Sequence, residues 1–257
     1  MKLAIGAALL GLAAIVSGAF ITSAKIALPP GQPEPGVLVH QVIGLLAIGL
    51  CLLLVAVSGR AQRIAAVGAL AALIASAAIG WTHPLSHGAA VWHATMAHLF
   101  TASMGMALLT APPVSTVPAG RFMALRPAAA ATPIAVFFQI VMGALYRHEV
   151  TGILPHMLGA MVVALLAMIV SALVVQHFSH VRELKRAAAL LISLVILQVV
   201  LGIAVFIMLL LNVSNTTAFV WTATAHATSG TLVFAASVLV AIEIYRRLVP
   251  GEIATAA

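Results

Sequence analysis

The sequence predicts an all-α integral membrane protein with eight transmembrane helices, arranged as two pseudo-symmetric four-helix bundles with both termini in the cytoplasm. Three observations predict this fold: the chain is 63% hydrophobic and 7% charged, long apolar runs recur along it, and its second half repeats the pattern of its first. A soluble protein carries about 25% charged residues, which solvate its surface. This chain has too few, so lipid is expected to cover most of its surface.

The apolar runs are each roughly 20 residues long, enough for a helix to cross about 30 Å of hydrocarbon. The alternating pattern of a transmembrane barrel is absent, so the spans are expected to be helices. They cover about residues 3–23, 37–57, 62–81, 89–112, 128–146, 152–175, 187–211 and 218–245.

The basic residues indicate topology. Of 12 Lys and Arg residues, only Lys25 and Arg147 fall at one set of helix ends. By the positive-inside rule the opposite set is cytoplasmic, in the inner (plasma) membrane of a cell. The net charge of +7 therefore does not predict a nucleic-acid partner. The cytoplasmic set comprises Lys2, Arg60, Arg63, Arg121, Arg126, Arg182, Lys185, Arg186, Arg246 and Arg247.

Two isolated features do not alter this plan. The N-terminal segment also fits a secretory signal, with Lys2, an apolar core and small residues near Ser23. Its removal would leave an odd number of spans and break the repeat. The single Cys51 lies deep in the second span without a partner cysteine, so we expect a small core residue rather than a redox or metal group.

The repeat divides the chain at its longest cytoplasmic link, residues 113–127. The N-terminal half is residues 1–115 and the C-terminal half is residues 116–257. His-Ala-Thr occurs at the same depth in the fourth and eighth spans, from His93 and from His226. Coincidence among alanine-rich helices is the alternative, but the matching topologies and histidine depths favour duplication in one orientation.

Four histidines are the candidate metal ligands. With the N-terminus inside, even-numbered spans start at the outer face, and one histidine lies within about two turns of each start. The four therefore share one layer, two per half. Two facing imidazoles can clamp a haem iron, and a polar ring inside a membrane is costly without a function. One alternative is that each histidine hydrogen-bonds to water or to a backbone carbonyl. Another is that the histidines bind zinc, which is less favoured because no cysteine or carboxylate lies beside them. The four are His40, His93, His156 and His226.

The fourth span offers a second histidine. His98 follows His93 by five residues, about 140° around a helix, so both cannot face one iron. The His-Ala-Thr match favours His93 and leaves His98 as the alternative ligand, otherwise directed at the substrate or the second half. A small residue four positions after each ligand would leave room for a flat ring; these are Gly44, Ala97, Ala160 and Gly230.

Other polar residues are expected near this layer. Lys25 and Arg147 are candidates for pairing with haem propionates, and His148 for a hydrogen bond to them. Arg147 has two alternatives, a pair with Glu149 or a lipid phosphate, and His148 has one, solvation. The remaining histidines are expected to be solvated in a loop (His83 and His87) or to mark the cytoplasmic end (His177 and His180).

Taken together, the eight spans, the paired histidines, the segment Gly-Ala-Leu-Tyr-Arg-His, and Gln139 and Gln198 four residues before Gly143 and Gly202 resemble the haem A synthase family of oxidase-assembly membrane proteins. The resemblance covers nearly the whole chain. It implies one haem site per half, with haem b as a cofactor between His156 and His226. The pair His40 and His93 would face haem O, whose methyl group the family oxidises to the formyl group of haem A.

The resemblance also implies partners: haem O, membrane lipid, haem O synthase, and a quinol or another electron donor. Self-association is left open. Two departures from the family pattern matter. Members usually carry a glutamate three residues before the first ligand, where this chain has Val37, and many have an outer cysteine pair, which this chain lacks. The nearest acid, Glu34, is the candidate catalytic residue, although it lies in a proline-rich loop.

Three functions remain open from the sequence. The first is a haem O monooxygenase. The second is a bis-histidine haem b electron-transfer protein, which the missing glutamate favours, and the third is a haem-handling assembly protein without turnover. A transporter without haem is disfavoured, because no span is broken near the membrane midplane.

Overall fold

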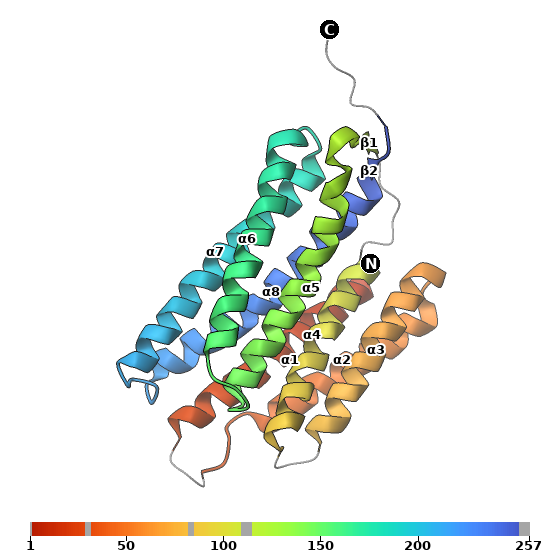
Figure 1. Ribbon diagram of the computed structural model, residues 1–257. Helices are drawn as coiled ribbons and strands as arrows, with labels where there is room; N and C mark the ends of the chain where they lie inside the picture. The colour runs from red at the N-terminus through yellow and green to blue at the C-terminus, as the bar shows by residue number, and fades with distance from the viewer. Residues whose placement is uncertain (1, 29–31, 82–84, 109–114, 252–257) are drawn as a thin grey trace.

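The computed structural model describes residues 2–28, 32–81, 85–108 and 115–251. This part of the chain forms eight α-helices, which make up nearly the whole fold (Figure 1). The helices are α1 (Lys2–Ala27), α2 (Val37–Val57), α3 (Arg60–Gly80), α4 (His87–Leu108), α5 (Leu125–Arg147), α6 (Leu154–His177), α7 (Arg182–Leu210) and α8 (Thr217–Arg247). The even-numbered helices all begin at one end of the molecule, the lower end in Figure 1.

Seven of these helices are long and apolar enough to cross a membrane, so the chain is a multi-pass membrane protein. The eighth, α4, has the length but not the hydropathy, because it carries three histidines and two threonines. Large apolar side chains cover outward faces, as at Leu38 and Met161, which are 72% and 69% exposed. Such apolar faces are suited to contact with the hydrocarbon chains of lipid.

The eight predicted segments are confirmed as helices to within a few residues, with the largest shift at α7. It starts at Arg182 rather than near residue 187, because the charged run Arg-Glu-Leu-Lys-Arg is helical, with Glu183 in the favourable first turn. The predicted end of the fourth span, at about residue 112, lies outside the described residues.

The described part of the predicted link at residues 113–127 is not a plain loop. It contains strand β1 (Val117–Pro118), the 3-10 helix η1 (Gly120–Ala124) and the first turn of α5. Strand β1 pairs in parallel with β2 (Leu248–Val249), directly after α8. This two-residue pairing, which has no periodic signal in the sequence, ties the middle of the chain to its C-terminal part.

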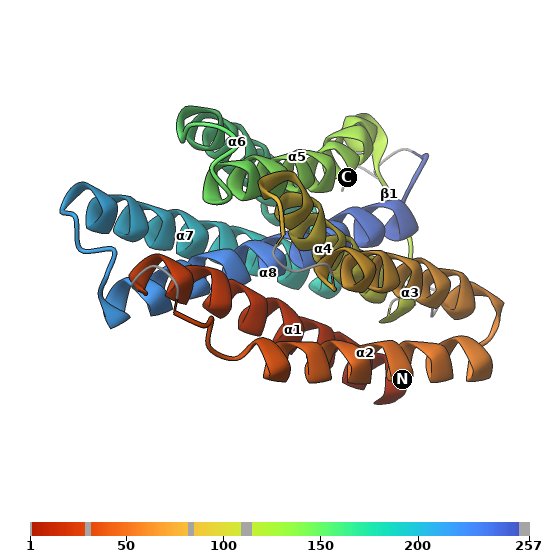
Figure 2. The ribbon, with the colours of Figure 1, turned by 90° about the horizontal axis from the view of Figure 1, so that it is seen from below.

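The described residues pack into two apolar clusters. One draws its buried members from α1 to α4 and includes many alanines, whereas the other runs from Ala119 to Leu248. Within each set of four helices, consecutive helices pack together and the first also contacts the fourth. Between the two sets, α8 contacts α1 and α4, and α4 contacts α5. Figure 2 shows α8 running between α7 and α1.

The helix ends before α6 and α8 share one turn geometry. Glu149 and Asn212 follow α5 and α7 in the left-handed region, with φ of 60° and 56°. In both turns the next residue's N–H reaches back to a helix carbonyl, Val150 to Leu145 at 2.8 Å and Val213 to Met208 at 3.1 Å. This is a Schellman-type ending, which satisfies carbonyls that a helix end leaves open. The same turn thus precedes both histidine-bearing helices of the second half.

A buried ion cluster closes the opposite end of α8. Arg247 is 5% exposed and Glu243 6% exposed. The Arg247 guanidinium donates to the Glu243 carboxylate one turn away, and its Nη1 lies 3.4 Å from Glu183 at the start of α7. In the sequence Arg247 indicated only the cytoplasmic end of the helix. In the structure its side chain joins α7 to α8.

Replacing Glu243 with alanine is therefore expected to lower the free energy of unfolding by about 2–4 kcal/mol, because Arg247 would keep its buried charge with Glu183 as its one remaining acidic partner among the described residues. Thermal unfolding in detergent measures this. Arg186→Ala, at an exposed position of the same end, is the control and should leave the melting temperature unchanged. Equal melting temperatures for wild type and Glu243→Ala would contradict a stabilising role for the cluster.

Candidate functional site

The four predicted ligands form two facing pairs. The ring centroids of His40 and His93 lie 5.9 Å apart, with planes at 72°. Those of His156 and His226 lie 6.1 Å apart, with planes at 89°. Two imidazole–metal bonds of about 2 Å, with about 1.1 Å from each nitrogen to its ring centre, span roughly 6 Å. The centroid separation of each pair would therefore allow both imidazoles to bind one metal ion. All four residues are partly exposed rather than sealed in a core.

Each histidine ring packs against a glycine of the preceding helix. A methyl group added at the glycine would lie 2.6 to 3.0 Å from the ring Cε1, closer than atoms normally approach. Each histidine ring can therefore occupy its position only because the residue facing it is a glycine, which has no side chain. The four contacts are Gly18 with His40, Gly80 with His93, Gly143 with His156, and Gly202 with His226.

In the N-terminal half, both Nδ1 atoms lie beside hydrogen-bond acceptors. His93 Nδ1 lies 2.8 Å from the Ser76 carbonyl, which only accepts, so this Nδ1 carries the proton and Nε2 is the basic nitrogen. His40 Nδ1 lies 2.9 Å from the Ser17 hydroxyl. When that hydroxyl donates to the Ala14 carbonyl, also at 2.9 Å, its oxygen accepts from His40 Nδ1 in the same way. A metal-bound imidazole has this form, with its second nitrogen held by a neighbouring acceptor.

In the C-terminal half, glutamines take the place of these serines. The Gln139 amide Nε2 donates to the His156 carbonyl at 2.7 Å and lies 2.9 Å from His156 Nδ1. In this position Nδ1 is the acceptor, while Gln139 Oε1 and His226 Nδ1 are buried without a hydrogen bond among the described residues. Metal binding through His156 Nε2 therefore requires the Gln139 amide to turn, so that Oε1 accepts from a protonated Nδ1.

The second glutamine is held by α8. Gln198 Oε1 accepts from the Ser229 hydroxyl, which also lies 3.0 Å from the His226 carbonyl. Gly230 lies against the same amide, since a methyl group added at Gly230 would lie 3.2 Å from Gln198 Nε2. Gly230 thus accommodates a glutamine side chain rather than open space, whereas nothing lies within 4 Å of a methyl group added at Gly44.

His93, rather than His98, faces His40. His98 points across to the second half, where its Nδ1 lies 3.0 Å from the Thr231 hydroxyl on α8. Thr231 is fully buried. His98 follows His93 by five residues, and Thr231 follows His226 by five, so this bond joins equivalent positions of the two halves.

Arg147 also reaches the other half. Its Nη2 donates to the Ala19 carbonyl at 2.7 Å and to the Ser23 hydroxyl at 2.6 Å, both on α1. Ser23 is fully buried and lies 3.4 Å from the Thr224 hydroxyl of α8. The described residues give Arg147 no ion pair, with Glu149 or with any other carboxylate.

The other charged candidates are paired or neutral. Lys25 and Glu34 form an ion pair at 2.7 Å, so each of these candidates partners the other. Burial, with the Arg147 charge second, lowers the pKa of His148 to about 4, which leaves it neutral at neutral pH. The His148 carbonyl accepts from the exposed His87 ring, whereas His83 lies outside the described residues.

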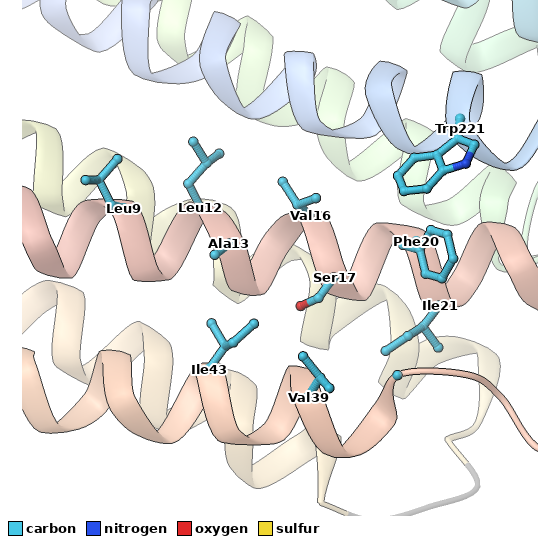
Figure 3. Close-up of a pocket in the computed structure, with 11 residues that line it drawn as sticks. Leu9, Leu12, Ala13, Val16, Ser17, Phe20, Ile21, Val39, Ile43 and Trp221 are labelled. Atoms are coloured by element: carbon cyan, nitrogen blue, oxygen red, sulfur yellow. The ribbon is translucent and has the colours of Figure 1, made fainter.

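An open apolar pocket of about 580 Å³ lies between α1, α2 and α8 (Figure 3). Phe20 and Trp221, whose ring centroids are 5.1 Å apart, line one end of it. Ser17 is the hydroxyl-bearing residue of the lining and points toward α2, which carries His40. The Ser17–His40 hydrogen bond therefore lies beside apolar side chains, and the low dielectric constant there strengthens it.

Neither the protein-family models nor the curated proteins give a match to this chain.

Several positioning residues were not predicted from the sequence. Gly18 and Gly80 are as close to their histidines as Gly143 and Gly202 are, and Ser76 fills the position of Gln139. A signal was present: Ser76, Gln139 and Gln198 each precede a ring-contacting glycine by four residues. Ser76 and Gln139 also precede their histidines by the same 17 residues. Only the glutamines match the family pattern, so the serines stood out less.

Proposed function

We propose that this chain is a haem-binding membrane oxidoreductase of the haem A synthase type, built as two pseudo-symmetric four-helix bundles. In this proposal His156 and His226 hold haem b, and His40 and His93 face haem O. The termini lie in the cytoplasm and the histidine layer lies near the outer face of the inner membrane. Haem O, lipid, haem O synthase and a quinol or another donor are its proposed partners.

One observation carries the proposal: two histidine pairs, each with about 6 Å between ring centroids, occupy equivalent places in the two sets of helices. A glycine packs against each of the four histidine rings, and a polar residue contacts Nδ1 in His40, His93 and His156. An interfacial histidine bonded to water needs neither the glycine nor the facing partner. Haem, when bound, would supply one-electron transfer and oxygen chemistry. The glycines and the polar residues beside Nδ1 would orient the histidine rings toward it.

A second candidate function is electron transfer by bound haem b without oxidation of haem O. It is favoured by the ion pair between Glu34 and Lys25 at 2.7 Å, because the nearest acid to His40 along the chain is already engaged. Val37, at the first position of α2, offers no carboxylate one turn before His40.

The test is to purify the protein from cells supplied with haem O and extract its pigments. Haem A or its hydroxylated precursor is expected if the first function holds. Haem b alone, reducible by quinol, would support the electron-transfer function instead. A colourless protein from haem-replete cells would overturn both.

A further inference from the structure

The polar contacts between the two halves lie close to the two histidine pairs. Arg147 follows Gly143, which contacts His156, by four residues and so lies one turn farther along the same face of α5. Its guanidinium bonds the carbonyl of Ala19, the residue after Gly18, which contacts His40. The Arg147 side chain therefore links two backbone segments, the part of α5 that contacts His156 and the part of α1 that contacts His40.

The charge of Arg147 is not balanced locally. Its hydrogen-bond acceptors are a carbonyl and a hydroxyl, both neutral. The nearby Lys25 is neutralised by Glu34, and His148 is uncharged at neutral pH because burial and Arg147 lower its pKa to about 4. A partly buried cation in a medium of low dielectric acts over a longer range than one in water.

We propose that Arg147 is a positioning residue shared by both haem sites, whose positive charge raises the reduction potential of each and links them electrostatically. This inference rests on the proposed haem binding. A fixed cation stabilises the site that holds one more electron, so both sites should be harder to reduce without it. The same charge favours the anionic propionates of a haem in either half.

The test is a spectroscopic redox titration of the purified haem-loaded protein. Arg147→Gln is expected to shift both midpoint potentials to more negative values, and Arg147→Lys to keep most of the wild-type value because it keeps the charge. Ser23→Asp is the second variant: it leaves Arg147 in place but puts a carboxylate beside its guanidinium. It should also shift both potentials negatively, and it serves if Arg147→Gln does not fold.

Thr231→Val is the matched control, since it removes another hydrogen bond between the halves, to His98, without changing charge. It should leave both potentials unchanged. The inference is overturned if Arg147→Gln and Ser23→Asp leave either potential at its wild-type value, or if Thr231→Val shifts them equally, which would indicate a general loosening. Absence of haem from the wild-type protein would instead overturn the proposed function, and this inference with it.

Discussion

Replacing His156 or His226 with alanine is expected to abolish the low-spin b-type absorption spectrum of the purified protein. The two rings are 6.1 Å apart and come from α6 and α8. Loss of either leaves at most one axial ligand, because the described residues place no third histidine in this pair. Low-spin haem needs two strong ligands, so the low-spin bands should disappear rather than weaken slightly. Optical and electron paramagnetic resonance spectra of each variant measure this.

His98→Ala is the matched control for that experiment. His98 is also a histidine inside a helix, α4 of the N-terminal set, but its Nδ1 is bonded to Thr231 rather than directed at His40. Its replacement should spare the C-terminal spectrum. An unchanged low-spin spectrum in both His156→Ala and His226→Ala would show that this pair does not hold haem. Loss of the spectrum in His98→Ala would show that the histidines are assigned to the wrong pairs.

The helices were predictable because the membrane imposes a simple rule on the sequence. An apolar run of roughly 20 residues has few stable forms in lipid other than a helix. The start of α2 at Val37 and its end at Val57 agree with the expected bounds. The exception is α4: it was predicted as an apolar run like the others, but its histidines lower its hydropathy below that of the other seven helices.

The two facing pairs could be predicted in part, since helix parity is expected to place His40, His93, His156 and His226 at equivalent depths. What depth cannot give is rotation about the helix axis. Whether His93 or His98 faces His40 depends on that rotation, which packing between α3, α4 and α8 determines. The repeated His-Ala-Thr indicated His93, but the bond from His98 to Thr231 has no signal in the sequence.

Long side chains were the least predictable part. Arg147 forms no ion pair with Glu149, one of its expected partners. It donates to the Ala19 carbonyl and the Ser23 hydroxyl, two contacts that the sequence did not predict. An arginine reaches several ångströms from its own helix, so its partners depend on which helices are neighbours. The contact of α1 with α8 creates this junction, and a linear pattern of hydrophobicity does not encode it.

The glycines beneath the rings lead to the second large effect. Gly143→Ala, and more strongly Gly143→Val, is expected to remove the low-spin spectrum while the protein remains folded. A methyl group at Gly143 would lie 2.9 Å from His156 Cε1 and 3.1 Å from Nδ1. The ring has little room to retreat, because Gln139 holds Nδ1 and the backbone of the same residue. His156 would therefore be displaced from His226.

Gly49→Ala separates this steric effect from the general effect of removing a helical glycine. Gly49 also lies inside a helix, but a methyl group added there would meet nothing within 4 Å. Alanine there should keep the spectrum and raise stability by about 0.5–1 kcal/mol, because glycine loses more conformational freedom in a helix. Gly143→Ala should also gain some stability from losing a helical glycine, but the low-spin haem spectrum should still disappear. A normal low-spin spectrum in Gly143→Val would show that His156 does not need the bare backbone of α5 to reach its partner.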